Sequence, residues 1–263
     1  MTSIRTARAF ASILTPAFLA MAGAGLAPSA AQAATEETQP QQADVYEQLY
    51  DALIGGVDTH ATVDNQIETL KHTLVTQDPN IAFANELKPG IIDRFGEAMR
   101  PWLLEHSTRV LAAFRPRFVA IFREELGAED TATMLAFYTS PLGRKILLSV
   151  SQNYTGSNTL GDINDFSDGD VIIDAADVEK DIATAAMRTA AQITPEDIAS
   201  DTSGFLTNAA LIEKMAHTNT KVTALRVEME QVQPDPDIAE GLIRSLEAIF
   251  DEIAPELKPD GAE

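Results

Sequence analysis

Hydrophobic residues recur at helical spacing along most of this chain. From residue 44 onward they fall three or four positions apart in successive segments, as on one face of an α-helix and unlike the alternation of a strand. Pro116 lies inside the longest such segment, where it removes the hydrogen bond to the carbonyl of Ala112 and predicts a kink. The predicted fold is all-α, a helical bundle with a kinked central helix. The helices expected in this half of the chain cover residues 44–54, 63–74, 81–87, 91–98 and 101–126.

A corner between two helices is predicted just after residue 139. Met134, Phe137 and Tyr138 share one helical face, and then Ser140 and Pro141 interrupt the pattern. A serine side chain accepts a hydrogen bond from a free N–H group of a new first turn, and proline suits the first position because it has no N–H and a preset φ. A new helix is therefore expected to begin at Pro141.

The helix after this corner contains a glycine where helices disfavour one. Leu142, Ile146 and Leu147 resume a buried face, and Gly143 lies within its first turn. Glycine is about 1 kcal/mol less favourable than alanine inside a helix. We therefore expect another part of the chain to pack closely over Gly143.

The segment around this corner resembles a known family. Residues 137–145 read Phe-Tyr-Thr-Ser-Pro-Leu-Gly-Arg-Lys and follow Glu129-Asp130 and the apolar run from Phe122 to Leu126. This arrangement resembles the Domain of Unknown Function 2059 family, whose members share a Phe-Tyr-x-Ser-Pro-x-Gly-x-Lys segment. The resemblance covers residues 100–154, with a looser match over 45–74. It implies a small, helical, exported protein of Gram-negative bacteria without an established activity. The motif residues are Phe137, Tyr138, Ser140, Pro141, Gly143 and Lys145.

The segment 211–232, which we call the seam, has the most regular pattern. It is typical of a helix that packs along another helix over three heptads. We favour packing within the same chain, and contact with a protein partner or a second copy in a homodimer is the alternative. Pro234 and Pro236 separate the seam from a final helix, and an antiparallel C-terminal hairpin or bundle is expected. The seam positions are Leu211, Met215, Thr218, Val222, Leu225, Met229 and Val232.

The first 33 residues predict a secretory signal peptide. Arg5 and Arg8 precede an uncharged stretch, and Ala31 and Ala33 stand at the −3 and −1 positions of a cleavage site after Ala33. The alternative is an uncleaved membrane anchor. Cleavage places the mature protein in the periplasm. The remaining segments are a flexible lead-in (34–43), an N-terminal helical domain (44–155), an acidic Gly- and Asp-rich loop (156–171), C-terminal helices (172–254) and a tail (255–263).

Charge and cysteine content narrow the function classes. Removal of residues 1–33 takes away two of the 19 Lys and Arg and none of the 40 Asp and Glu, so the net charge changes from −21 to −23. This charge opposes binding to nucleic acid and to anionic membranes. We therefore expect no nucleic-acid partner and no membrane contact after cleavage. The chain has no cysteine, so stability in an oxidising compartment must come from packing alone.

No residue set predicts a metal, cofactor or catalytic site. The histidines lack the spacing of metal ligands, and Ser140 has neither a Gly-x-Ser-x-Gly nor a Ser-x-x-Lys context. The acidic loop aligns partly with an EF-hand, but the third and twelfth positions would be Phe166 and Ala175. A solvated loop is favoured over an irregular cation site. The acids of that site would be Asp162, Asp165, Asp168 and Asp170.

Three function classes follow. The first is a non-enzymatic adaptor or chaperone-like protein that works by contact through its helix faces. The second is a binder of small hydrophobic ligands, with a pocket lined by Trp102, Phe114, Phe118, Phe122, Phe137 and Tyr138. The third is an enzyme, which would require ionisable groups to converge in one cleft, namely His106, Arg144, Lys145 and the pair Glu124-Glu125. Two alternatives remain for Arg123, Arg144 and Lys145. They form either a basic patch or, as we favour, salt bridges to acidic residues, namely Glu124, Glu125, Glu129 or Asp130.

Overall fold

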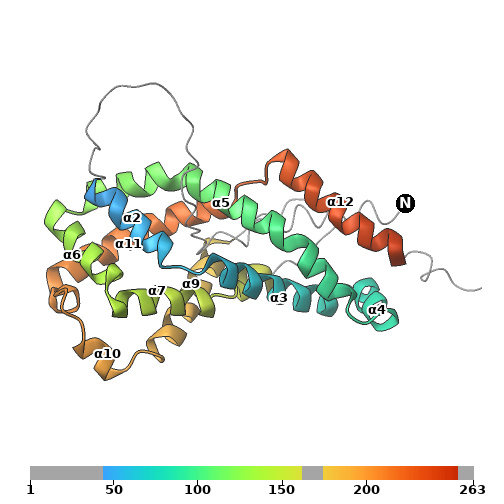
Figure 1. Ribbon diagram of the computed structural model, residues 1–263, viewed down its shortest axis with the longest axis horizontal. Helices are drawn as coiled ribbons and strands as arrows, with labels where there is room; N and C mark the ends of the chain where they lie inside the picture. Colours follow the sequence, from blue (N-terminus) through green and yellow to red (C-terminus); the bar gives the residue numbers. More distant parts are fainter. Residues whose placement is uncertain (1–43, 162–173, 254–263) are drawn as a thin grey trace, which may run out of the picture.

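The computed structural model describes residues 44–161 and 174–253, and every regular element in these ranges is helical (Figure 1). The all-α prediction is confirmed. The predicted signal peptide, lead-in and tail, and the cation site of the acidic loop, lie outside the described residues. The elements are α2 (Val45–Gly55), α3 (Thr59–Gln77), α4 (Pro79–Leu87), α5 (Ile91–Glu125), α6 (Ala128–Thr139), α7 (Pro141–Asn153), α8 (Ser157–Gly161), α9 (Ala175–Ala190), α10 (Pro195–Ala199), the short 3-10 helix η1 (Phe205–Thr207), α11 (Ala209–Glu230) and α12 (Pro236–Ile253).

Side chains at the helix starts explain several boundaries. Asp58 accepts a hydrogen bond from the N–H of Ala61 at 3.0 Å and begins α3, and Asn208 accepts one from Leu211 at 3.1 Å and begins α11. Helix α5 instead follows Gly90, whose φ of 89° is a conformation that glycine adopts without strain. These local signals set helix boundaries through contacts within one turn.

The longest helix, α5, runs through both of its prolines. The break predicted between residues 98 and 101 is wrong, because the 35 residues from Ile91 to Glu125 form one helix with Pro101 and Pro116 inside it. A proline removes one backbone hydrogen bond, and the packing of α3 and α12 against α5 offsets that loss around Pro101. Figure 1 shows the axis of α5 bending partway along its length, as expected of a helix that contains proline.

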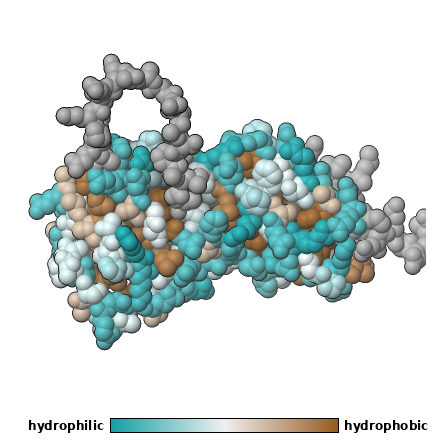
Figure 2. Space-filling model, viewed as in Figure 1, coloured by the Kyte–Doolittle hydropathy of each residue, from teal (hydrophilic) through white to brown (hydrophobic). Residues whose placement is uncertain are grey.

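Two hydrophobic cores follow each other along α5. The first core surrounds Phe95 and Met99 and combines α5 with α3, α4 and α12. The second core surrounds Phe118 and Phe122 and combines α5 with α2, α6, η1 and α11. Figure 2 shows that hydrophilic residues cover much of the visible face, with hydrophobic residues interspersed. Helix α5 is therefore the element that joins the two halves of the molecule.

Helices α11 and α12 together follow α5 in the antiparallel direction. Both pack on α5, one on each core, and this arrangement replaces the expected antiparallel hairpin between them. Each core thus contains residues from both sides of the 156–171 segment. Four positions of the seam, Leu211, Val222, Leu225 and Met229, are buried in the second core. The register is marked by the ion pairs Lys221–Glu124 (2.9 Å), Arg117–Glu228 (2.7 Å), Arg109–Asp235 and Arg109–Asp237 (2.8 Å each) and Arg94–Glu252 (2.5 Å).

Candidate ligand-binding site

The corner between α6 and α7 is closed by backbone packing. The Oγ of Ser140 accepts a hydrogen bond from the N–H of Gly143 at 3.1 Å, and Pro141 occupies the first position of α7. A Cβ on Gly143 would lie 2.1 Å from the carbonyl oxygen of Phe137 and 2.6 Å from the Cα of Tyr138. Only glycine lets the two helices approach this closely without a shift of the backbone.

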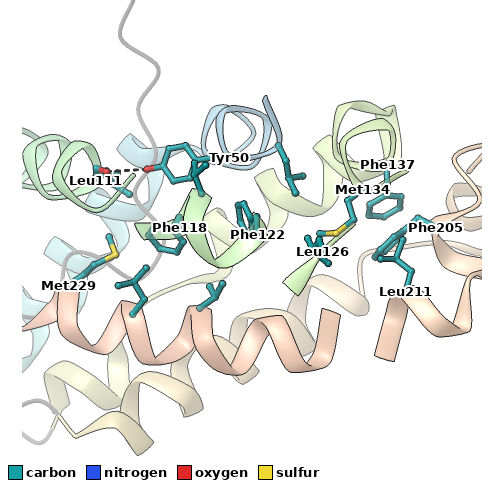
Figure 3. Packing of buried hydrophobic residues seen from close by; sticks show 14 of the residues in the cluster. Tyr50, Leu111, Phe118, Phe122, Leu126, Met134, Phe137, Phe205, Leu211 and Met229 are labelled. Carbon is teal, nitrogen blue, oxygen red and sulfur yellow. Dashed lines mark hydrogen bonds between the residues drawn. The ribbon is translucent and has the colours of Figure 1, made fainter. Parts of the chain in front are cut away.

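The corner places the two motif aromatics in different surroundings. Phe137 is 2% exposed, and its ring centroid lies 4.5 Å from that of Phe205 inside the second core (Figure 3). Tyr138 lines a cavity beside that core, and burial raises the pKa of its hydroxyl to about 12. Lys145 forms an ion pair with Asp197 of α10 at 2.6 Å. The motif thus contributes one aromatic to the core and one to a cavity wall.

The cavity has a volume of about 380 Å³ and lies between α2, α5, α6, α7, α9 and α11. Figure 3 shows several of its lining residues, among them Tyr50, Leu111, Phe118, Phe122 and Met134, on the side of the second core that faces α11. Two lining residues, Ala186 of α9 and Asn219 of α11, are exposed. The cavity therefore opens to solvent between α9 and α11. Its volume falls within the range of small-molecule sites, which are about 300–1,000 Å³ and mostly apolar.

Few polar groups interrupt the apolar wall, and two of them are already bonded. The hydroxyl of Tyr50 donates to the carbonyl of Leu111 at 3.1 Å, as Figure 3 shows, and the hydroxyl of Thr218 donates to the carbonyl of Lys214 at 2.9 Å. Tyr138 has no hydrogen bond to any residue in 44–161 or 174–253. Its hydroxyl is therefore available to a molecule in the cavity.

Among the described residues that line the cavity, Arg226 of α11 is the charged one. Within the part of the chain that the structure describes, its guanidinium makes neither a hydrogen bond nor an ion pair. Burial lowers the pKa of Arg226, and the ionisable groups of Tyr154, Glu230 and Tyr138 act in the opposite direction. Arg226 as a whole residue is half-buried, and anionic oxygens are the natural partners of a partly desolvated guanidinium.

The arginines of α5 show the usual arrangement in this protein. All six form ion pairs with carboxylates, so each arginine on the helix that carries both cores is paired with a negative charge. The pairs are Arg94–Glu252, Arg100–Asp64, Arg109–Asp235, Arg115–Asp51, Arg117–Glu228 and Arg123–Asp44. Arg226 forms no such ion pair within the described residues, although the chain has a large excess of acidic residues.

The structure places half of the predicted pocket residues around the cavity. Phe118, Phe122 and Tyr138 line it, whereas Phe137 is in the core and Phe114 packs against that core. Trp102 lies elsewhere, against Gly241 of α12 in the first core, and its Nε1 donates to the Oγ of Ser245 at 3.1 Å. The sequence patterns did not predict Arg226 as a site residue. Two apolar seam residues flank it in the sequence, Val222 four positions before it and Met229 three positions after it.

The ionisable residues predicted for an enzyme do not line this cavity. His106 is 3% exposed, Arg144 is exposed, and Lys145 pairs with Asp197. Glu124 and Glu125 both pair with Lys221. The members of the predicted basic patch likewise have different surroundings, since Arg123 pairs with Asp44 rather than with the acids expected from the sequence. In 44–161 and 174–253, no group of three or more His, Asp or Glu is placed to hold a metal ion.

These observations define an all-helical protein with an arginine in the wall of an apolar cavity. Residues 112–149 match the family described as "Uncharacterized protein conserved in bacteria (DUF2059)", which confirms the resemblance over the motif. This match covers the second part of α5, all of α6 and much of α7. No curated protein and no solved structure matches the chain. Among the described helices, none combines the length and the apolar character that crossing a membrane requires.

Proposed function

We propose that this protein is an exported, periplasmic binding protein that holds a small apolar molecule in the cavity between α2, α5, α6, α7, α9 and α11. The observation that carries the proposal is the cavity itself, about 380 Å³ in volume and open to solvent beside Ala186 and Asn219. The signal-peptide pattern of residues 1–33 supports export. This choice favours the second of the three function classes over the contact protein.

The size of the cavity sets the size of the ligand. An engineered cavity of about 150 Å³ lined by apolar side chains binds benzene, which has six carbon atoms. In proportion, about 380 Å³ accommodates roughly fifteen non-hydrogen atoms, or one medium-length alkyl chain. Each buried methylene contributes about 0.8 kcal/mol, and loss of translational and rotational freedom offsets part of the sum. Micromolar affinity is therefore the expected scale.

We also propose that the protein performs no covalent chemistry on this ligand. The ionisable groups in the described wall are Tyr50, Tyr138 and Arg226. Burial raises the pKa of both tyrosines to about 12, and Tyr50 is bonded to a carbonyl. General base catalysis near neutral pH needs a group with a pKa close to the working pH, and both tyrosines titrate far from it.

The test is isothermal titration of the exported protein with 1-dodecanol, a neutral probe of the predicted size. We expect saturable binding with one site, and Ala186→Trp should weaken it strongly because the new ring fills the opening. Ala183→Trp is the matched control, since Ala183 is exposed on the same helix but does not line the cavity. Absence of binding to the unmodified protein, or equal binding by both variants, would refute the proposal.

Contact with a protein partner or a second copy through 211–232 is the second candidate. It is supported by Ile212, which is 45% exposed on α11. The buried seam positions already pack inside the chain, so a partner would contact only the outer face of α11. Light scattering on the exported protein tests this candidate: a dimer that Ile212→Glu dissociates supports it, and a monomer at high concentration excludes the homodimer.

A further inference from the structure

The cavity wall contains two half-buried polar groups to which a purely hydrophobic ligand would offer no hydrogen bond. Arg226 and Tyr138 both line it, and the charge of the guanidinium acts on the tyrosine hydroxyl and lowers its pKa in opposition to burial. Neither makes a hydrogen bond to a residue in the described ranges 44–161 and 174–253. Both are hydrogen-bond donors, and the guanidinium presents its N–H groups in a planar fork that matches a carboxylate.

We propose that the ligand of this cavity is an amphiphile with one alkyl chain and a carboxylate head, and that Arg226 and Tyr138 bind the head. This inference rests on the proposed function and adds the chemical class of the ligand. The alkyl chain would occupy the apolar part of the cavity beside Leu111, Phe118 and Met134.

The size and charge of the site favour this class over other amphiphiles. A cavity for roughly fifteen non-hydrogen atoms matches a medium-length fatty acid and is too small for a lipid with two chains. The overall charge of −21 repels anions from the surface at long range, so an anionic ligand needs a local cation inside the site. Arg226 is such a cation: Glu230 acts on it electrostatically, but unlike the six arginines of α5 it forms no ion pair or hydrogen bond with a carboxylate of the described residues.

The first experiment compares head groups on one chain length and needs no variant. Dodecanoate, 1-dodecanol and dodecyltrimethylammonium are titrated into the exported protein at neutral pH. A charge-assisted hydrogen bond contributes about 1.5–3 kcal/mol, so dodecanoate should bind roughly ten- to a hundredfold more tightly than 1-dodecanol. The ammonium compound should bind least. Dodecyl phosphate tests whether the site prefers a phosphate monoester, and tighter binding of that compound than of dodecanoate would overturn the assignment of a carboxylate.

The second experiment removes the two donors in turn. Arg226→Met should abolish the preference for dodecanoate over 1-dodecanol, whereas Tyr138→Phe should reduce it about two- to tenfold. Arg244→Met is the control for net charge, because Arg244 is exposed on α12 and distant from the cavity. It should leave the preference unchanged.

The outcomes separate this inference from the function on which it rests. Equal affinity of the unmodified protein for dodecanoate and 1-dodecanol would overturn the inference and leave the hydrophobic binding function intact. A preference for dodecanoate that survives Arg226→Met would also overturn it. If none of the compounds binds, the proposed function itself fails. The comparison of head groups remains decisive even if Arg226→Met does not fold.

Discussion

Replacement of Gly143 by alanine should destabilise the protein, although alanine is the better helix former. The Cβ of alanine would lie 2.1 Å from the carbonyl oxygen of Phe137 and 2.6 Å from the Cα of Tyr138. Both are backbone atoms, which cannot rotate away as a side chain does. The α6–α7 corner would therefore have to open.

The magnitude follows from two opposing contributions. Alanine in place of glycine inside a helix stabilises by about 1 kcal/mol, and extra atoms in a well-packed region destabilise by about 1–3 kcal/mol, or more where the backbone must shift. A net loss of about 2 kcal/mol is expected. In a chain of this size it corresponds to a decrease in Tm of roughly 4–8 °C.

Gly55→Ala is the matched control for this prediction. Gly55 is the last residue of α2, and a Cβ there would meet nothing within 4 Å. This variant should be neutral or more stable by up to about 1 kcal/mol. Urea unfolding of the two variants and the unmodified protein measures both effects. A Gly143→Ala variant as stable as the Gly55→Ala variant would refute the close packing at the corner.

Three further predictions concern buried and paired groups. Asp181→Ala removes a carboxylate that accepts hydrogen bonds from the backbone and side chains of Asn158 and Thr159 at 2.7–2.9 Å. This variant should lower the free energy of unfolding by about 3 kcal/mol or more, and unchanged urea unfolding would contradict this. Burial lowers the pKa of His106 below 6.5. The contribution of the neutral imidazole to stability is therefore present above pH 6.5 and is lost as the pH falls through the folded-state pKa. His106→Gln should flatten the pH dependence of the free energy of unfolding in this window, and an identical slope would exclude the effect. Lys145→Gln should raise the pKa of Asp197 from about 2 toward 3.8, because Lys145 is the main cause of its depression, and an NMR titration in which that pKa does not move would show that the ion pair is absent.

Local features of the fold could be predicted from the sequence because single residues determine them. Ser140 and Pro141 predicted the start of α7, which the structure has, and Thr194 with Pro195 forms a start of the same kind at α10. The spacing of the seam predicted an inward face of α11, where Leu211, Leu225 and Met229 are buried. These signals act within one turn of helix, so they need no knowledge of the tertiary structure.

Tertiary context decided the features that the sequence did not reveal. Pro101 ordinarily ends or bends a helix, but α5 continues through it where α3 and α12 pack on both sides. The spacing in the seam predicted an inward face for α11 but not its partner helix, which proved to be α5; α12 also packs on α5. The surroundings of Arg226 could not be predicted for the same reason. Its position in the sequence of α11 does not show whether the guanidinium faces solvent, a carboxylate or a cavity.

A crystal structure of the protein with ω-bromododecanoate tests the central claim most directly, because the bromine atom marks the end of the alkyl chain by its anomalous scattering. We predict one strong bromine peak among Leu111, Phe118 and Met134 and a carboxylate within hydrogen-bonding distance of Arg226. A cavity filled by the protein's own side chains, or a bromine peak confined to the outer surface, would contradict the account.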